Sequence, residues 1–173
     1  HGTHMLSGFR CCTAPTCSLR FVAQASDDRT LRLWDVSTAG CIRVFAGHAG
    51  PVSCAMISPD GATAASASED RTVRVWHLAS GKMLCKLPLP NERASPRSIS
   101  FSSNGRLLAC ACERTVSIWE VRDLSPRSGD GTPPQPTLNF ESSVPLMNAS
   151  FVPNHAVLIA SGIETGSSAA ADQ

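Results

Sequence analysis

The sequence predicts an all-β fold built from a repeated unit of strands. Trp34, Trp76 and Trp119 recur 42 and 43 residues apart, a period typical of propellers and solenoids. The residues before each tryptophan alternate between apolar and polar, which is the period of a β-strand. Turn-forming residues such as Pro59-Asp60-Gly61 and Ser103-Asn104-Gly105 separate these stretches. No convincing helical periodicity accompanies them, so strands are the expected elements throughout.

Size and charge exclude several classes of protein. A chain of 173 residues is long enough for one domain with a core. Its 15 Lys and Arg against 14 Asp and Glu leave a net charge of +1, so no direct nucleic acid partner is expected. The 42% hydrophobic content argues against wholesale disorder. No stretch approaches the roughly 20 apolar residues of a membrane-spanning helix, and no signal peptide is evident, so a soluble protein without a membrane partner is expected.

The eight cysteines do not form a recognisable disulfide or zinc pattern. Their density is too low for a small stapled domain, and Cys12-x4-Cys17 and Cys110-Ala-Cys112 are not zinc-finger spacings. We therefore expect reduced thiols, mostly buried, in the cytosol or nucleus. No metal or cofactor is predicted.

Taken in order along the chain, the repeats are expected at about residues 1–40, 41–82 and 83–122, followed by last strands within 136–162. The strands are expected at 4–11, 19–25, 29–35, 41–46, 51–57, 62–68, 72–78, 83–87, 97–102, 106–112, 114–121, 136–141, 145–152 and 155–161. A Pro/Gly/Ser-rich loop is expected at 122–135 and a disordered tail at 163–173.

The tryptophan motifs resemble those of the WD40 (WD-repeat) family. The Trp-Asp signature stands as Trp34-Asp35 and is degraded to Trp76-His77 and Trp119-Glu120, while Gly47-His48 supplies the Gly-His signature. The resemblance implies a β-propeller of four-stranded blades. Fourteen expected strands make a fragment of about three and a half blades over residues 1–162. Because a closed propeller needs at least about four blades, we expect this chain to be the carboxy-terminal part of a longer polypeptide.

The same resemblance implies a hydrogen-bond network inside each repeat. Tryptophan Nε1–H is a donor that needs an acceptor when buried, and an Asp at the head of a tight turn can accept backbone N–H groups. In the second repeat the implied members are His48, Ser66 or Ser68, Asp70 and Trp76. The implied counterparts are, in the first repeat, His1, Ser26, Asp28 and Trp34, and, in the third, Trp119 with Glu113 in place of Asp and Asn91-Glu92 in place of Gly-His. The third network is therefore expected to be incomplete.

Ser, His and Asp in one neighbourhood also resemble a hydrolase triad. The structural interpretation is favoured, because the serine would lie inside a strand and no Gly-x-Ser-x-Gly motif is present. No catalytic residue is assigned, although a propeller enzyme remains an alternative. The turns beside each acidic position carry the candidate partner-binding residues, which are Asp27, Arg29, Glu69, Arg71 and Arg114.

A narrower resemblance is to the subunit 5 family of the general transcription factor TFIID. It lies in Cys41–Pro51, in Ile57–Gly61 and in the last apolar pair, Val144–Phe151 and Ala156–Gly162. It implies a nuclear, non-catalytic scaffold that supports transcription initiation and docks onto histone-fold TFIID subunits in a multiprotein complex. The alternative is another WD-repeat scaffold, such as a ubiquitin-ligase substrate receptor or a cytoskeletal regulator, with the cytoplasm as the alternative location.

Overall fold

The computed structural model describes residues 20–89, 95–121, 134–152 and 158–162, and these ranges contain strands and no α-helix. The all-β prediction is confirmed. Within these described ranges, thirteen strands form four antiparallel sheets. Sheet 1 holds β1 (Phe21–Ala25), β2 (Thr30–Asp35) and β3 (Gly40–Ala46); sheet 2 holds β4 (Val52–Ile57), β5 (Thr63–Ser68), β6 (Thr72–His77) and β7 (Met83–Pro88); sheet 3 holds β8 (Pro96–Phe101), β9 (Leu107–Cys112), β10 (Thr115–Glu120) and β11 (Leu138–Glu141); sheet 4 holds β12 (Leu146–Phe151) and β13 (Leu158–Gly162).

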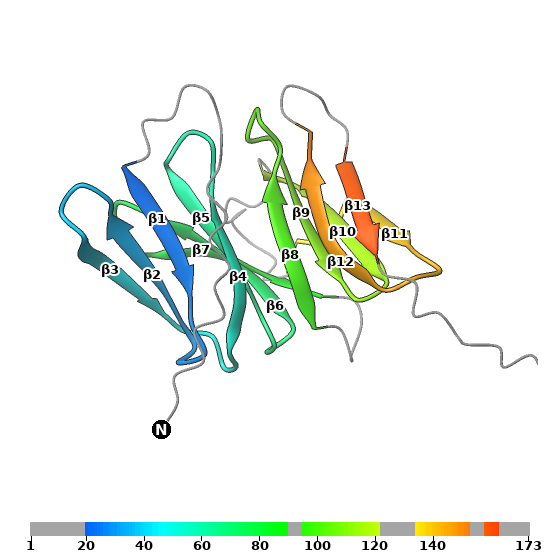
Figure 1. Ribbon diagram of the computed structural model, residues 1–173, viewed down its shortest axis with the longest axis horizontal. Coiled ribbons are helices and arrows are strands. Elements are labelled where there is room, and N and C mark those ends of the chain that lie inside the picture. The colour runs from blue at the N-terminus through cyan, green and yellow to red at the C-terminus, as the bar shows by residue number, and fades with distance from the viewer. Residues whose placement is uncertain (1–19, 90–94, 122–133, 153–157, 163–173) are drawn as a thin grey trace, which may run out of the picture.

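Strands that follow one another along the chain are neighbours within each sheet, so every sheet is an up-and-down meander. The sheets stand side by side in chain order, with sheet 1 at one end and sheet 4 at the other (Figure 1). This is the arrangement of consecutive propeller blades, and the described part of the chain is a partial β-propeller.

The equivalent strands β2, β6 and β10 are called third strands here, because β6 and β10 come third in their sheets, and β1, β5 and β9 before them are called second strands. The alternating sequence of a third strand gives its sheet two apolar faces. In β6, Val73 and Val75 point to one side of sheet 2 and Trp76 to the other. Trp76 lies opposite Ala64 of β5, whose small side chain leaves room for the indole ring. Because a strand has a side-chain period of two, this register fixes which face meets each neighbouring sheet.

Each tryptophan of sheets 2 and 3 packs on the sheet before it. Trp76 joins Leu31, Leu33 and Phe45 of sheet 1 in one cluster, and its ring lies 5.6 Å from the Phe45 ring. Trp119 joins the equivalent residues of sheet 2, Val73, Val75 and Leu87. Burying one side chain of this size contributes on the order of 3 kcal/mol, so the contacts between sheets hold the molecule together.

Between sheets 3 and 4 the contact has a different composition. It contains Val116 and Ile118 of β10 with Ala149 and Phe151 of β12, and no aromatic residue of a third strand.

Some sequence-based expectations lie outside the described residues. These are the strand at 4–11, His1, Asn91-Glu92, the loop at 122–135 apart from its last two residues, and the tail at 163–173. Within the described ranges, no helix is long and apolar enough to cross a membrane.

Candidate protein-interaction face

The turns between second and third strands share an unusual backbone. Ser26–Thr30 and Ser68–Thr72 are built alike, and Arg29 and Arg71 adopt φ angles of 70° and 65°. Left-handed geometry is costly for a residue with a side chain. The aspartate before each arginine offsets that cost. Asp70 Oδ1 accepts Thr72 N–H at 3.1 Å and Thr72 Oγ1–H at 2.6 Å, and Asp28 holds Thr30 in the same way at 3.0 and 2.5 Å.

Backbone hydrogen bonds join these turns to the sheet that follows. Val52 N–H donates to Ser26 O at 3.1 Å, and Leu146 N–H donates to Glu113 O. In sheet 2, Glu69 N–H donates to Pro51 O at 3.0 Å. The turns and the connection 47–51 therefore lie on one rim of the sheets, at the end where second strands finish and third strands begin.

All five candidate partner-binding residues lie on this rim and are exposed. We call them the loop face: Asp27, Arg29, Glu69, Arg71 and Arg114. The loop face mixes both charges, and its turns in sheets 1 and 2 are held by hydrogen bonds to Asp28 and Asp70. Such a surface suits recognition of a partner with a mixed charge pattern.

The network beneath the loop face is continuous in sheet 2. Trp76 Nε1–H donates to Ser66 Oγ at 2.9 Å, and Ser66 Oγ lies 2.8 Å from His48 Nε2. His48 Nδ1 lies 2.8 Å from Asp70 Oδ2, which also accepts Ala49 N–H at 2.9 Å. Ser68 has a separate task, because its hydroxyl donates to Gly50 O at 2.9 Å and accepts Asp70 N–H at 3.1 Å.

These distances fix the protonation of His48. Ionised Asp70 can only accept, so Nδ1 carries the proton and Nε2 accepts Ser66 Oγ–H. Burial, together with the charges of Arg74 and Lys86, lowers the pKa of His48 from 6.5, although Asp70 acts in the opposite direction. Burial acts to raise the pKa of Asp70, but hydrogen bonds from Thr72, Ala49 and His48 outweigh it and lower that pKa to about 2. The pair is neutral histidine with ionised aspartate.

Glycine is required immediately before this histidine. Gly47 has a φ of 151°, and a Cβ there would lie 2.5 Å from Nη1 of Arg74 and 3.4 Å from the Trp76 ring. Glycine stands before His48 for two reasons. Its φ is one that other residues rarely adopt, and its backbone passes too close to Arg74 and Trp76 for a side chain to fit.

Sheet 1 satisfies its tryptophan differently from the expectation. Trp34 Nε1–H donates to Gln24 Oε1 at 2.8 Å, not to Ser26, whose hydroxyl instead accepts Asp28 N–H at 3.3 Å. Gln24 stands ten residues before Trp34, as Ser66 stands ten before Trp76. The amide side chain of Gln24 is long enough to reach the indole of Trp34. The ten-residue spacing could have identified Gln24 as the acceptor from the sequence.

Sheet 3 differs from sheet 2 more than sheet 1 does. Its turn has only Glu113 and Arg114 between the paired Cys112 and Thr115, whereas three residues separate Ser68 from Thr72. Glu113 does not take the part of Asp70, because Thr115 Oγ1–H donates to Cys112 O at 3.2 Å, whereas Thr72 Oγ1–H donates to Asp70.

The same shift makes Cys110 and Cys112 the counterparts of Ser66 and Ser68. Their sulfur atoms lie 3.6 Å apart, and the contact with Cys112, together with burial, raises the pKa of Cys110. Trp119 Nε1 is buried without a hydrogen-bond partner among the described residues. The network of sheet 3 lacks the hydroxyl that serves Trp76.

Although Ser66, His48 and Asp70 have the order and spacing of a hydrolase triad, the serine is inaccessible. Ser66 is 0% exposed, and its oxygen already accepts the Trp76 indole N–H. A nucleophile needs an open path to a substrate carbonyl. This arrangement can hold strands together but offers no attacking oxygen to solvent.

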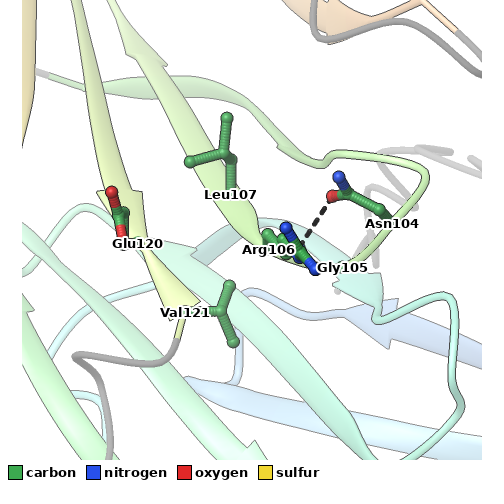
Figure 2. Close-up of a pocket in the computed structure, with 6 residues that line it drawn as sticks. All are labelled: Asn104, Gly105, Arg106, Leu107, Glu120 and Val121. Atoms are coloured by element: carbon green, nitrogen blue, oxygen red, sulfur yellow. Dashed lines mark hydrogen bonds between the residues drawn. The ribbon is translucent and has the colours of Figure 1, made fainter.

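A pocket of about 620 Å³, whose lining residues are drawn in Figure 2, lies at the end of sheet 3 opposite the loop face. It is lined by Asn104, Gly105, Arg106, Leu107, Glu120 and Val121. Asn104 Oδ1 accepts Arg106 N–H at 3.0 Å and shapes the turn. None of these six residues is a serine, cysteine or histidine, so the lining offers no such nucleophile.

No group of three or more metal-binding side chains is found in the part of the chain that the structure describes. The five cysteines there are free thiols: Cys41, Cys54, Cys85, Cys110 and Cys112. Most cysteines were expected to be buried. Of these five, Cys110 and Cys112 are buried, Cys54 and Cys85 are half-buried, and Cys41 is exposed.

Comparison with known proteins places these repeats. The family model described as WD domain, G-beta repeat (WD40) matches residues 2–35, 39–77 and 85–120. A small ribosomal subunit protein RACK1y from Oryza sativa is 34% identical over 111 residues, which cover 61% of this chain and 32% of the relative. Transcription initiation factor TFIID subunit 5 from Caenorhabditis elegans is 30% identical over 95 residues, 55% of this chain and 14% of the relative. An F-box protein from Saccharomyces cerevisiae is 28% identical over 104 residues, 56% of this chain and 16% of the relative. The chain thus spans a third or less of each of these relatives.

Proposed function

Because this chain belongs to the WD40 family, we propose that it is a non-catalytic protein–protein interaction scaffold that binds its partner through the loop face. The observation that carries the proposal is the position of Arg29 and Arg71. Both are exposed at the tip of a turn whose backbone is fixed from below by Asp28 or Asp70. Rigid presentation reduces the entropy lost when a partner binds.

We further propose a TFIID subunit 5-like role in transcription initiation, in the nucleus, with histone-fold TFIID subunits as partners. Similarity to TFIID subunit 5 over 95 residues supports it. So do the last apolar stretches, of which Val144–Phe151 includes β12. The near-neutral charge favours protein partners over direct DNA contact.

A ubiquitin-ligase substrate receptor is the second candidate. A probable E3 ubiquitin ligase complex SCF subunit sconB from Emericella nidulans is 60% identical over 35 residues, which cover 20% of this chain and 5% of that protein. The identity is high, but the matched segment is only 35 residues long, which is the length of a single shared repeat.

The test measures binding of the purified chain to a recombinant histone-fold pair of TFIID subunits. The charge-reversed variant Arg29→Glu/Arg71→Glu is expected to weaken binding about tenfold or more while its melting temperature stays close to wild type, because exposed turn charges contribute little to stability. The matched control is Lys82→Glu/Arg106→Glu, which alters exposed charges at the opposite ends of the strands.

Absence of wild-type binding to the histone-fold pair would contradict the TFIID role. Recovery of an SCF core or of small ribosomal subunits from cell extract would then identify the competing class. Equal binding by both charge variants would contradict the loop face as the binding surface.

A further inference from the structure

Three strands of the fold each expose a single residue, and they do so at the same place. These strands are β4, β8 and β12, called first strands here because each precedes the second strand of its sheet. Ser53 is the exposed residue of β4, Arg97 that of β8 and Met147 that of β12, and each stands second in its strand. All other residues of these three strands are buried or half-buried.

A β-bulge accounts for this shared exposure. The register of each first strand against its neighbour shifts at this position, so Ser53, Arg97 and Met147 have no paired residue opposite them. A bulge inserts an extra residue into a strand and changes the direction of its side chain, and bulges are frequent beside functional sites. Backbone geometry therefore fixes where this side chain points, whereas its chemistry differs from sheet to sheet.

The bulged residues lie near one another at the loop-face end of the sheets. β8 contacts both β4 and β12, so the first strands are neighbours (Figure 1). The residue before Arg97 pairs with Cys112, at the start of the turn that carries Arg114. Leu146 donates its N–H to a carbonyl of the same turn, which places Met147 beside it as well. We call the three bulged residues the bulge row: Ser53, Arg97 and Met147.

The charge of Arg97 is not compensated by the described part of the chain. No carboxylate there lies within ion-pair distance of Arg97 or Arg114, and the acidic residue of the adjacent turn, Glu113, pairs with neither. Two unpaired guanidinium groups therefore belong to one corner of sheet 3. The planar fork of an arginine donates two parallel hydrogen bonds to a carboxylate, so this corner suits an acidic side chain.

Met147 adds an apolar contact beside this positive charge. Its side chain is 48% exposed, although Leu146 before it is only 5% exposed. Methionine is flexible and adapts to apolar groups of different shapes, and both methionine and arginine are enriched at protein interfaces. Along the bulge row the chemistry changes from polar at Ser53 to positive at Arg97 and apolar at Met147.

We propose that the bulge row selects the partner of the scaffold by binding a segment in which a carboxylate stands next to an apolar side chain. The carboxylate pairs with Arg97, and the apolar side chain covers Met147. This inference rests on the proposed function and adds the chemistry of the bound segment. The net charge of +1 and the apolar Met147 favour such a segment over a nucleic acid.

The test selects random phage-displayed peptides on the 173-residue chain. Wild type is expected to enrich peptides with an acidic residue beside an apolar one, and Met147→Ser should lose the preference for the apolar neighbour. In fluorescence anisotropy with an enriched peptide, Arg97→Glu is expected to weaken binding about tenfold or more, and Arg97→Gln less. Arg106→Glu, which reverses an exposed arginine at the other end of sheet 3, is the matched control and should bind as wild type.

Enrichment of peptides without acidic residues, or equal binding by Arg97→Glu and wild type, would overturn the proposal. So would a single-stranded oligonucleotide that displaces the peptide and no longer binds Arg97→Glu, because the bulge row would then serve a nucleic acid. Failure of the proposed function has a different signature: Arg29→Glu/Arg71→Glu would bind the histone-fold pair as wild type does, while Arg97→Glu would still lose the peptide.

Discussion

At the scale of single residues, the three tryptophans share a position and differ in the group that accepts their indole N–H. Gln24 accepts the Trp34 N–H and Ser66 accepts the Trp76 N–H. Cys110 occupies the matching position near Trp119, and no described group accepts the Trp119 indole N–H. A buried donor without a partner costs about 1–3 kcal/mol. Sheet 3 therefore carries a local destabilisation that sheet 2 does not.

Replacing each tryptophan by phenylalanine should expose this difference. Both substitutions remove the same ring volume, but Trp76→Phe also removes a hydrogen bond, whereas Trp119→Phe removes an unpaired donor. Trp76→Phe is expected to lower the free energy of unfolding by about 1–3 kcal/mol more than Trp119→Phe. Urea denaturation measures it, and equal losses would show that Trp119 is satisfied after all.

The state of His48 gives stability a defined pH dependence. Its pKa is lowered in the folded chain, so between 6.5 and that lower value the unfolded chain binds more protons and stability falls as pH falls. Asp70 adds a loss of the same sign as pH falls from 3.8 to about 2. Both groups therefore favour the folded state near neutral pH.

Urea denaturation between about pH 7 and pH 5 tests the histidine part. His48→Gln is expected to be less stable at neutral pH but to lose less on acidification. His77→Gln, at the end of β6 where His77 Nδ1 lies 2.8 Å from Ser80 Oγ, is the histidine substitution outside the network, and its loss on acidification is compared with that of wild type. A slope unchanged by His48→Gln would contradict the neutral assignment.

At the scale of the element, the turns and connections are set by backbone geometry. Gly47 and Gly61 both have positive φ, at 151° and 70°, but only a Cβ at Gly47 meets another group within 4 Å. Gly47→Ala should therefore destabilise the fold more than Gly61→Ala, for which about 1–2 kcal/mol of left-handed strain is the expected cost. Thermal melts compare the two, and an equal effect would mean that Arg74 moves aside freely.

Most strands follow from the sequence, because alternation and turn residues are local signals. Expectations of 72–78 and 106–112 correspond to Thr72–His77 and Leu107–Cys112 in the structure. The fold class and the family were confirmed. The strand register of sheet 3 was not predicted from the sequence. The turn of sheet 3 is one residue shorter, so Cys110-Ala-Cys112 matches Ser66-Ala-Ser68 only when the strands, and not the Arg-Thr pairs, are aligned.

Exposure of Phe140 could not be predicted from its own neighbourhood. Phe45, Leu87 and Phe140 sit in similar strands, and their burial depends on whether the next sheet supplies a third strand. The Trp34 contact escaped for another reason, since a glutamine reaches the indole where a serine was expected.

At the scale of the whole molecule, the sheets stack face to face, and the tryptophans of sheets 2 and 3 each pack on the sheet before. The loop face gains its rigidity from this stacking, because the turns rise from strands whose inner faces are buried. Leu138 and Phe140 of β11 are 52% and 53% exposed, so the described sheets do not cover this face of sheet 3.

A double-mutant cycle between Phe45 and Trp76 tests the stacking most directly. Phe45→Leu and Trp76→Leu should each destabilise the fold and should couple by about 0.5–1.5 kcal/mol, because their rings touch across the sheets. Phe45→Leu with Trp119→Leu, across different interfaces, should be additive. Additive losses for Phe45 and Trp76, with coupling between Phe45 and Trp119, would contradict the arrangement.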